Sequence, residues 1–449
     1  MSFGTYGDIA IVNSGVGALV AFPSTSDKDV SVTRVLIESE NEAGEIASWG
    51  ADNNYPNNYS NKVRKNESAM SGQRVIRKAH YGSGFVLAEE KFDTDGKREI
   101  IQKSVRQYSE IKDFWRINKM KRFWLETILD LEFWAIAFPE YILSKDFKKI
   151  NRVERKKTAH CRFELMDKKT GHIKNVYLSA KWGESPDMDS DFVAKIPLID
   201  NYWTAEEVKE YCKKNKIRNF VRPIFYPLLD ESYYPKADWH SADKSGWLDI
   251  ANSIPEFKKA FIQNQINIKF LIEVSELYFD KKYGDDWRAY TSEERKEIRD
   301  QFVTDLDSTL RDNANAGKSI LSVIYTGNNG EPLPGLKITA IDNKLQDGAY
   351  SADTGEGVQR ILTAIGVDPS LIGAGIPGGK LGAGSGSDKR EAWLILSALL
   401  KTNRETTLEV FEFIQEYNGW DENLIGGFED TVLTTLDKNP TGTEKAAQL

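Results

Sequence analysis

Two short segments of the sequence carry a glycine–lysine pair of the kind that can bind phosphate groups. A nucleotide-binding loop also needs a glycine five residues before that pair and a serine or threonine directly after it. The Gly379-Lys380 pair has neither of these neighbours. The Gly317-Lys318-Ser319 run has the correct end but lacks the leading glycine. The sequence therefore predicts no nucleotide-binding loop.

Other patterns of catalytic residues are also missing. The sequence has no Gly-x-Ser-x-Gly elbow and no His-Glu-x-x-His pair, and its adjacent acidic residues lie in polar runs typical of a surface. The two cysteines do not have zinc-ligand spacing with the four histidines, which are His80, His160, His172 and His240. We therefore expect no catalytic residues, no metal and no cofactor, and we expect Cys161 and Cys212 to be ordinary reduced residues.

The length and composition indicate a folded protein of several parts. A chain of 449 residues is expected to form two to four packed units, and 40% hydrophobic residues exclude wholesale disorder. No apolar run approaches 18 residues and no signal peptide is recognisable, so we expect no membrane span and synthesis in a cytoplasm. A net charge of -8 disfavours tight DNA binding by a general basic surface, but it allows a protein through which DNA passes.

The most unusual segment contains seven glycines within residues 371–387. Such a composition cannot offset its ordering entropy by burial, so we expect a mobile loop. A helix over about 350–366 precedes the loop, because apolar residues recur at helical intervals before Gly366. A second helix, capped by Asp388, is expected to follow the loop and to run for about 30 residues.

The chain before this segment divides into regions of different pattern. Residues 1–50 are typical of strands, helical patterns follow at about 60–80 and 98–130, and short strands with turns follow at 133–182. Residues 145–162 contain eight basic and two acidic residues. This run is consistent with a patch for DNA or a partner, but alternating charges on exposed strand faces are the commoner explanation.

A third long helix and an insertion come next. Ser253 and Glu256 form a capping box that predicts a helix through about Ile268. Residues 270–345 then alternate strand and helix patterns, with a second capping box at Thr291 and Glu294. The insertion therefore lies between two helices in the sequence.

This order of elements resembles the portal proteins of tailed bacteriophages. The stretch 361–374 and the Ser387-Asp388 pair beyond the glycines are similar to the end of the second stem helix and its loop in that family. Fainter similarities occur at 315–321, at Tyr233-Tyr-Pro235 and at Asn53-Asn-Tyr-Pro56. The resemblance covers about residues 50–435 and is strong only between 235 and 420.

The resemblance implies an α+β fold with a portal-like wing, stem and clip, long helices and a short antiparallel meander. The N-terminal wing would comprise residues 1–240, with the meander at 133–182. The remaining parts would be a first stem helix at 246–268, a clip at 270–345, a second stem helix at 350–366, a tunnel loop at 369–387, a long wing helix at 388–417 and a reduced crown at 418–449.

The resemblance also implies a function. About twelve copies would form a ring at one capsid vertex, through which double-stranded DNA enters and later leaves. The partners would be the large terminase subunit, the major capsid and scaffolding proteins, and the head–tail adaptor proteins. The protein would reside in the virion after synthesis in the host bacterial cytoplasm. The alternative is a minor capsid or head–tail adaptor protein without a role in DNA translocation.

Candidate site residues follow from these assignments. Lys380 is the only charged residue between Leu371 and Ser387, so a ring would bring these lysines to the DNA phosphates; the alternative is a solubilising lysine. Lys389 and Arg390 are further candidates for phosphate contact. The loop glycines are Gly373, Gly375, Gly378, Gly379, Gly382, Gly384 and Gly386. The expected stem-packing residues are Ile254, Phe257, Phe261, Ile268, Val358, Ile361, Leu362 and Ile365.

Overall fold

The computed structural model divides into two compact units. It describes residues 3–6, 9–12, 18–21, 45–92, 98–227, 229, 232–265, 270–311, 324–326, 331–340, 349–373 and 386–431. Unit 1 comprises Met1–Asp249 and Gly355–Leu449, and unit 2 comprises Ile250–Thr354.

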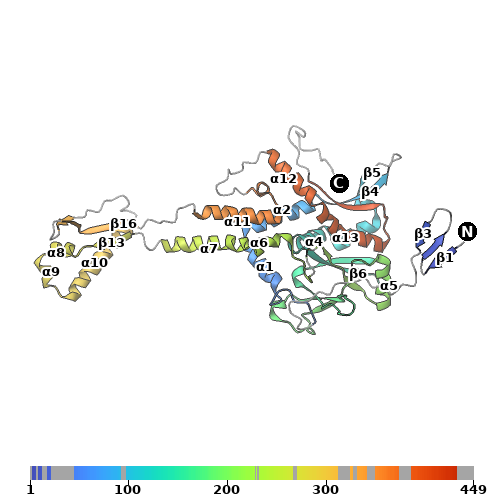
Figure 1. Ribbon diagram of the computed structural model, residues 1–449, viewed down its shortest axis with the longest axis horizontal. Coiled ribbons are helices and arrows are strands. Elements are labelled where there is room, and N and C mark those ends of the chain that lie inside the picture. Colours follow the sequence, from blue (N-terminus) through green and yellow to red (C-terminus); the bar gives the residue numbers. More distant parts are fainter. Residues whose placement is uncertain are drawn as a thin grey trace. The chain divides into compact units, whose positions relative to one another are not determined.

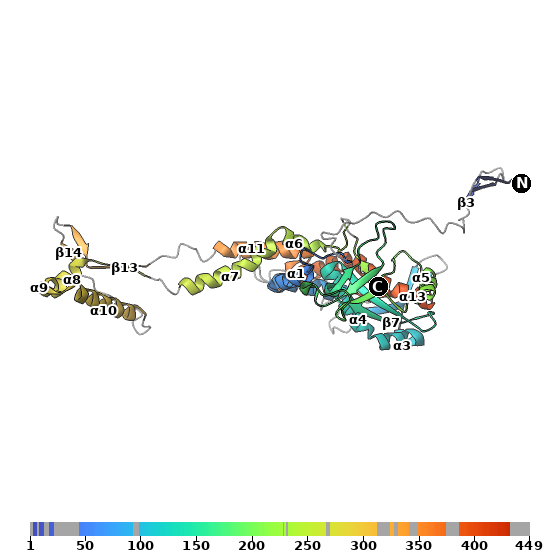
Figure 2. The same ribbon diagram turned by 90° about the horizontal axis from the view of Figure 1, so that it is seen from below.

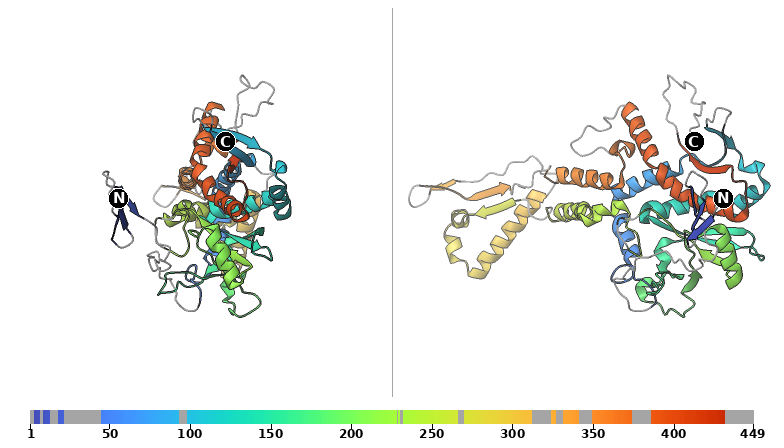
Figure 3. Two further views of the ribbon diagram at one scale, coloured as in Figure 1. Left: turned by 90° about the vertical axis from the view of Figure 1, so that its right-hand side faces the viewer. Right: turned by 45° about the vertical axis from the view of Figure 1, so that its right-hand side comes forward.

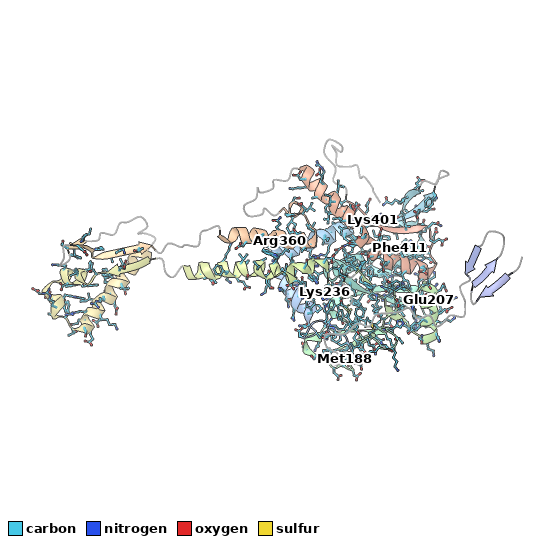
Figure 4. All side chains as sticks on the ribbon, viewed as in Figure 1. Met188, Glu207, Lys236, Arg360, Lys401 and Phe411 are labelled. Carbon is cyan, nitrogen blue, oxygen red and sulfur yellow. The ribbon has the colours of Figure 1, made fainter. Side chains whose placement is uncertain are left out.

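The main core of unit 1 is built on a four-stranded antiparallel sheet. The central strand β6 pairs with β7 along one edge and with β11 and β12 along the other. Helices α3, α4 and α13 pack against this sheet, and Trp124 and Phe411 are almost fully buried among them (Figures 1 and 4). The bounds are β6 Ile136–Leu143, β7 Ile150–Lys156, β11 Asn219–Val221, β12 Ile224–Phe225, α3 Ser109–Asn118, α4 Met120–Trp134 and α13 Lys401–Asn418.

Three smaller antiparallel sheets also belong to unit 1. Their strand orders are β1-β2-β3, β10-β9-β8 and β17-β4-β5. The bounds are β1 Phe3–Tyr6, β2 Ile9–Val12, β3 Ala18–Ala21, β4 Gly84–Phe92, β5 Arg98–Lys103, β8 Cys161–Phe163, β9 Asn175–Leu178, β10 Ala194–Pro197 and β17 Leu424–Glu429. The other helices of unit 1 are α1 Tyr55–Arg64, α2 Glu67–Tyr81, α5 Ala205–Asn215, α6 Ser241–Lys244 and α12 Gly386–Leu399. Figure 2 shows α5 and α13 close together, and α3 beside β7.

The described residues of unit 2 include two two-stranded sheets and the helices α8, α9 and α10, drawn in yellow and light orange in Figure 3. Strand β13 pairs with β16, and β14 pairs with β15, both antiparallel. Phe279 and Trp287 stack with ring centroids 5.1 Å apart, and Phe302 packs on Phe279. The bounds are β13 Phe270–Val274, α8 Glu276–Tyr283, α9 Asp285–Ala289, α10 Ser292–Arg311, β14 Ile324–Thr326, β15 Pro332–Pro334 and β16 Leu336–Ala340. Helices α7 Trp247–Gln265 and α11 Ala349–Ile365 pass from one unit into the other.

Sequence patterns located several elements correctly. The structure is a mixture of helices with short antiparallel sheets, which confirms the α+β class. The capping box of α10 forms as predicted, because Thr291 N donates to Glu294 Oε2 at 2.8 Å and Glu294 N donates to Thr291 Oγ1 at 3.3 Å. In the predicted strand region at 1–50, residues 3–6, 9–12 and 18–21 are strands, and residues 22–44 lie outside the described residues.

Four expectations differ from the structure. Residues 98–103 form strand β5, because pairing with β4 overrides the local helical pattern. The strands of 133–182 do not form one meander, since β6 and β7 belong to one sheet and β8 and β9 to another. The long helix after the glycines is interrupted at Leu400, although helical hydrogen bonds continue from Leu396 O to Leu400 N and from Leu400 O to Arg404 N.

The fourth difference concerns the start of helix α7. The helix begins at Trp247 and contains Pro255 in its interior, so Ser253 is not its N-cap. The Ser253 hydroxyl instead donates to Ile250 O at 2.9 Å, a bond that serine makes inside a helix. Among the described residues, no helix is long and apolar enough to cross a membrane.

Candidate functional site

The described residues on both sides of the glycine segment meet in one small apolar cluster. Ala79 of α2 forms this cluster with Leu396 and Leu400 of helix α12, which follows the segment. Leu371, which precedes the segment in a short 3₁₀ turn, Pro369–Leu371, packs against the same cluster. Both flanks of residues 374–385 are therefore fixed in unit 1.

The end of α11 is fixed by a glycine cap. Gly366 has φ +79°, a conformation that glycine adopts without strain. Gly366 N donates to Thr363 O and Val367 N donates to Leu362 O, at 3.1 and 3.0 Å, which is the Schellman pattern of a helix end. The Asp368 carboxylate then accepts a hydrogen bond from Ser370 N at 2.8 Å and caps the next turn.

The second predicted stem helix packs tightly on α2. Ile361, Leu362 and Ile365 are at most 5% exposed, and Val358 is half-buried. A Cβ at Gly72 of α2 would lie 2.8 Å from Ile365 Cδ1 and 3.1 Å from Leu362 Cδ2. The close approach of the two helices therefore depends on a glycine in α2. On the opposite side of the helix, the Arg360 guanidinium lies 5.7 Å from the Trp247 ring (Figure 4).

The other predicted site residues have mixed placements. Ile254 is buried, whereas Phe257 is 46% exposed, so the apolar stripe of α7 is only partly covered within this chain. Phe261 lies in α7 but its side chain is not described, and Ile268 lies outside the described residues. Lys389 is exposed and Arg390 is half-buried. Gly373 and Gly386 border the segment, and the other loop residues, Gly375, Gly378, Gly379, Lys380, Gly382 and Gly384, lie outside the described residues.

The first turn of α12 carries a favourable charge. Asp388 lies beside the backbone N–H groups, which carry partial positive charge. Lys389 and Arg390 are the fourth and fifth residues of the helix, where the dipole effect falls off.

A buried polar cluster joins helices α2, α4 and α13 of unit 1. His80 Nδ1 lies 2.5 Å from Glu132 Oε1, and His80 Nε2 lies 3.0 Å from Thr407 Oγ1. The Tyr226 hydroxyl and the Asn403 amide donate to the same carboxylate oxygen, at 2.9 and 3.1 Å. The cluster thus ties three helices together with directional bonds.

The cluster is structural, not catalytic. Burial favours the neutral form of Glu132, but the His80 hydrogen bond and charge outweigh this and hold the pKa of Glu132 below its usual range. The burial of Tyr226, with the charge of Glu132, raises the pKa of the phenol well above normal. Both ring nitrogens of His80 are occupied and the side chain is fully buried, so the ring has no free nitrogen for a substrate.

A second cluster surrounds the fully buried Arg162. Its Nε donates to Asn53 Oδ1 at 2.5 Å, and a terminal nitrogen donates to Asn53 O at 2.7 Å. The other terminal nitrogen donates to Cys161 O and Ala159 O, at 2.7 and 3.2 Å. Burial lowers the pKa of Arg162 to about 10, so the guanidinium stays charged at neutral pH. All four acceptors of its hydrogen bonds are carbonyl oxygens. Among the described residues, no carboxylate forms an ion pair with Arg162 within 4 Å.

This cluster brings together two sequence phrases that are far apart in the chain. Trp49, four residues before the 53–56 phrase begins, stacks on Tyr234 with ring centroids 4.2 Å apart. The Tyr234 hydroxyl donates to Ala47 O at 2.6 Å and accepts from Phe163 N at 3.0 Å. The phrases at 53–56 and 233–235 therefore hold the β8 sheet to the start of α1.

Sequence reasoning missed both clusters. His80 and Glu132 are 52 residues apart, and neither lies in a recognisable motif. Among the residues that the structure describes, no group of three His, Cys, Asp or Glu side chains is placed to hold a metal ion. Both cysteines are buried free thiols, and burial raises the pKa of Cys212 to about 12.

Comparisons with known proteins identify the fold but no family. No family model matches the sequence, and no curated protein matches it. A chain in the virion of the native gene transfer agent particle is similar in structure, with TM-score 0.52 and 14% identity over 84% of this chain and 82% of that chain. A chain in the neck of the empty particle, computed with C6 symmetry, has TM-score 0.53 and 14% identity, covering 81% of each chain.

A third similar chain comes from the neck of the native particle, computed with C12 symmetry. It has TM-score 0.52 and 13% identity, and the match covers 86% of each chain. At identities this low, the similarity shows a shared fold and nothing about activity. The shared fold extends over most of both chains in all three cases.

Proposed function

We propose that this chain is a bacteriophage portal protein, which forms a homo-dodecameric ring at one vertex of a capsid. The observation that carries the proposal is the fold shared with chains of gene transfer agent necks over more than four-fifths of both chains, in one case in a structure computed with C12 symmetry. In this role the ring is a conduit for genome packaging by terminase and for DNA ejection. It also provides the docking site for tail or adaptor proteins.

The proposed parts follow the chain. Residues 1–240 and 388–417 form the wing, α7 and α11 form the stem, and 270–345 form the clip that meets the large terminase subunit and later the adaptors. Residues 369–387 form the tunnel loop, and 418–449 form a reduced crown. The packing of both flanks of 374–385 into one apolar cluster supports the loop assignment, because a DNA-facing loop needs fixed ends.

Charge supports passage of DNA without tight binding. Twelve copies at -8 each give a strongly acidic assembly, which repels a duplex overall. Lys380, Lys389 and Arg390 then supply local cations that touch phosphates transiently. The protein is a structural component of the virion and not an enzyme.

The proposal is tested by the mass and shape of the purified full-length chain. Native mass spectrometry and end-on electron microscopy should reveal a particle of about 610 kDa, twelve copies of 50.9 kDa, with a central hole. A monomer that hydrolyses nucleotide would contradict the proposal. A smaller closed oligomer without a channel would favour the alternative, a minor capsid or head–tail adaptor protein.

A further inference from the structure

One surface of unit 1 is a basic hollow. It has a volume of about 330 Å³ and lies where the end of α1 meets α2, α4 and the chain just beyond β7. One lining carboxylate, Asp130, accepts two hydrogen bonds of 2.5 Å from Arg155 and is neutralised by it. Three further cations, which define the basic hollow here, have no ion pair within 4 Å among the described residues: Arg64, Arg77 and Lys157.

The positive charge of the basic hollow is offset only in part. Burial and then the like charge of Arg74, one helical turn earlier, lower the pKa of Arg77, and the charge of Glu132 opposes them. Arg64 and Lys157 are exposed at the rim, and the floor contains the apolar side chains of Phe133 and Trp134. A carboxylate side chain from outside would gain three cationic partners there.

A second surface of unit 1 is an acidic stripe on α13. Glu405, Glu409 and Glu412 are spaced at four and three residues, so they share one exposed face of the helix. None of them has an ion pair within 4 Å among the described residues. Burial and then Glu412 raise the pKa of Glu409, with Arg222 opposing, and burial and then Glu405 raise that of Glu412. The three carboxylates therefore repel one another in the isolated chain.

The two surfaces lie at opposite edges of the same sheet. The basic hollow is next to β7, which pairs with one edge of β6. The acidic stripe is on the side of α13 near Arg222, between β11 and β12, and these strands pair with the other edge of β6. Complementary patches at opposite edges fit a head-to-tail contact, the type of contact that closes rings.

We propose that the acidic stripe of one copy docks on the basic hollow of the next copy around the ring. This inference rests on the proposed function and assigns the residues of its subunit contact. Copies of a chain with net charge -8 repel one another at long range, so a local pairing of opposite charges fixes which surfaces meet and in which register.

The test is a charge exchange between copies of the full-length chain. One variant carries Arg64→Glu and Lys157→Glu, and a second carries Glu405→Lys and Glu412→Lys. A control variant, Lys112→Glu with Lys121→Glu, makes the same charge change at exposed residues of α3 and α4. Native mass spectrometry records each variant alone, the 1:1 mixture of the first two, and one chain with all four exchanges.

We expect each of the first two variants to lose the ring and run at 50.9 kDa, while the control keeps the ring. The mixture should restore a ring of alternating copies, and the chain with all four exchanges should restore a homo-oligomeric ring, because every contact is again complementary. Rings from both separate variants, or no rescue by mixing and by the fourfold exchange, would overturn the inference. A wild-type chain that is itself monomeric would instead overturn the proposed function.

Circular dichroism and thermal melting check that each variant is folded. If a reversed variant melts below the wild type, Lys157→Gln and Glu412→Gln replace the reversals in the same comparison. Neutral variants that assemble as the wild type does, with no shift in the salt concentration that dissociates the ring, would likewise overturn the inference.

Discussion

Replacement of Arg162 by methionine tests whether a buried cation holds the 53–56 phrase in place. Methionine has a similar length and is apolar, so the change removes the donors with little loss of volume. Four acceptors then lose a donor: Asn53 Oδ1, Asn53 O, Ala159 O and Cys161 O. Asn53 Oδ1 keeps the hydrogen bond that Trp49 N donates at 3.0 Å. The backbone carbonyl oxygens of Asn53, Ala159 and Cys161 lose the hydrogen bond from Arg162.

The expected loss in the free energy of unfolding is worked out from these hydrogen bonds. A lost hydrogen bond that leaves a buried partner costs about 1 kcal/mol or more, which gives about 3 kcal/mol for the three carbonyls. Loss of the guanidinium contacts with the Trp49 and Trp182 rings, at 5.5 and 5.4 Å, adds about 1 kcal/mol. The variant no longer has to bury a charged group, which offsets about 1 kcal/mol. We therefore expect the free energy of unfolding to fall by about 3 kcal/mol.

The assay is urea unfolding at a fixed protein concentration, with Arg152→Met as the matched control. Arg152 is in β7 with its side chain 55% exposed, so its replacement should change the free energy of unfolding by less than about 0.5 kcal/mol. The Asn53→Gly variant keeps the left-handed backbone, φ +52°, but removes Oδ1, and it should couple to Arg162→Met by about 1 kcal/mol in a double-mutant cycle. Equal unfolding of the Arg162 and Arg152 variants would refute the reasoning.

Three further predictions concern Glu132 of the buried polar cluster, Gly366 at the end of α11, and the glycine segment. Glu132→Gln should lower the free energy of unfolding by about 2 kcal/mol at pH 7, because it removes the charge that pairs with His80. The pKa of Glu132 is lowered in the folded state, so this contribution to stability is present above pH 4.5 and is lost at more acidic pH. Urea unfolding should therefore show a smaller difference between the variant and the wild type at pH 3. Gly366→Ala should lower the free energy of unfolding by about 1 kcal/mol through left-handed strain alone, since no atom lies within 4 Å of the new Cβ; an unchanged urea midpoint would contradict the cap. Deletion of 374–386 should leave the ring mass, less the deleted residues, at twelve copies and impair DNA packaging or retention in an infection assay; loss of the ring would contradict the tunnel-loop assignment.

Local patterns were sufficient wherever a few neighbouring residues determine the structure. The capping box at Thr291 and the glycine that ends α11 are both local, and both form as predicted. Ser253 shows the limit of such reasoning, because the same pattern occurs within a helix that starts six residues earlier. Local sequence cannot distinguish a cap from an interior serine when packing extends the helix.

Electrostatic partners far apart in the chain could not be predicted in this way. For the basic run at 145–162, the sequence leaves a patch for DNA or a partner open and favours exposed alternating charges. In the structure several of these residues form ion pairs: Lys149 with Glu110, Arg155 with Asp130 and Lys156 with Glu140. Arg162 belongs to the same run but is fully buried. A sequence gives the charges, and only the fold determines which of them meet.

The charged side chains that form no ion pair among the described residues are more informative than the paired ones. Once the paired residues of that run are set aside, Lys157 stands beside Arg64 and Arg77 at one edge of the sheet, while α13 presents three carboxylates beyond the other edge. Within one chain the like charges of each group repel one another, and Glu132 and Arg222 offset this only in part for Arg77 and Glu409. In the proposed ring each basic hollow would face an acidic stripe, which would turn both repulsions into attraction. The charge arrangement and the proposed assembly therefore explain each other, and the charge exchange between copies tests them separately.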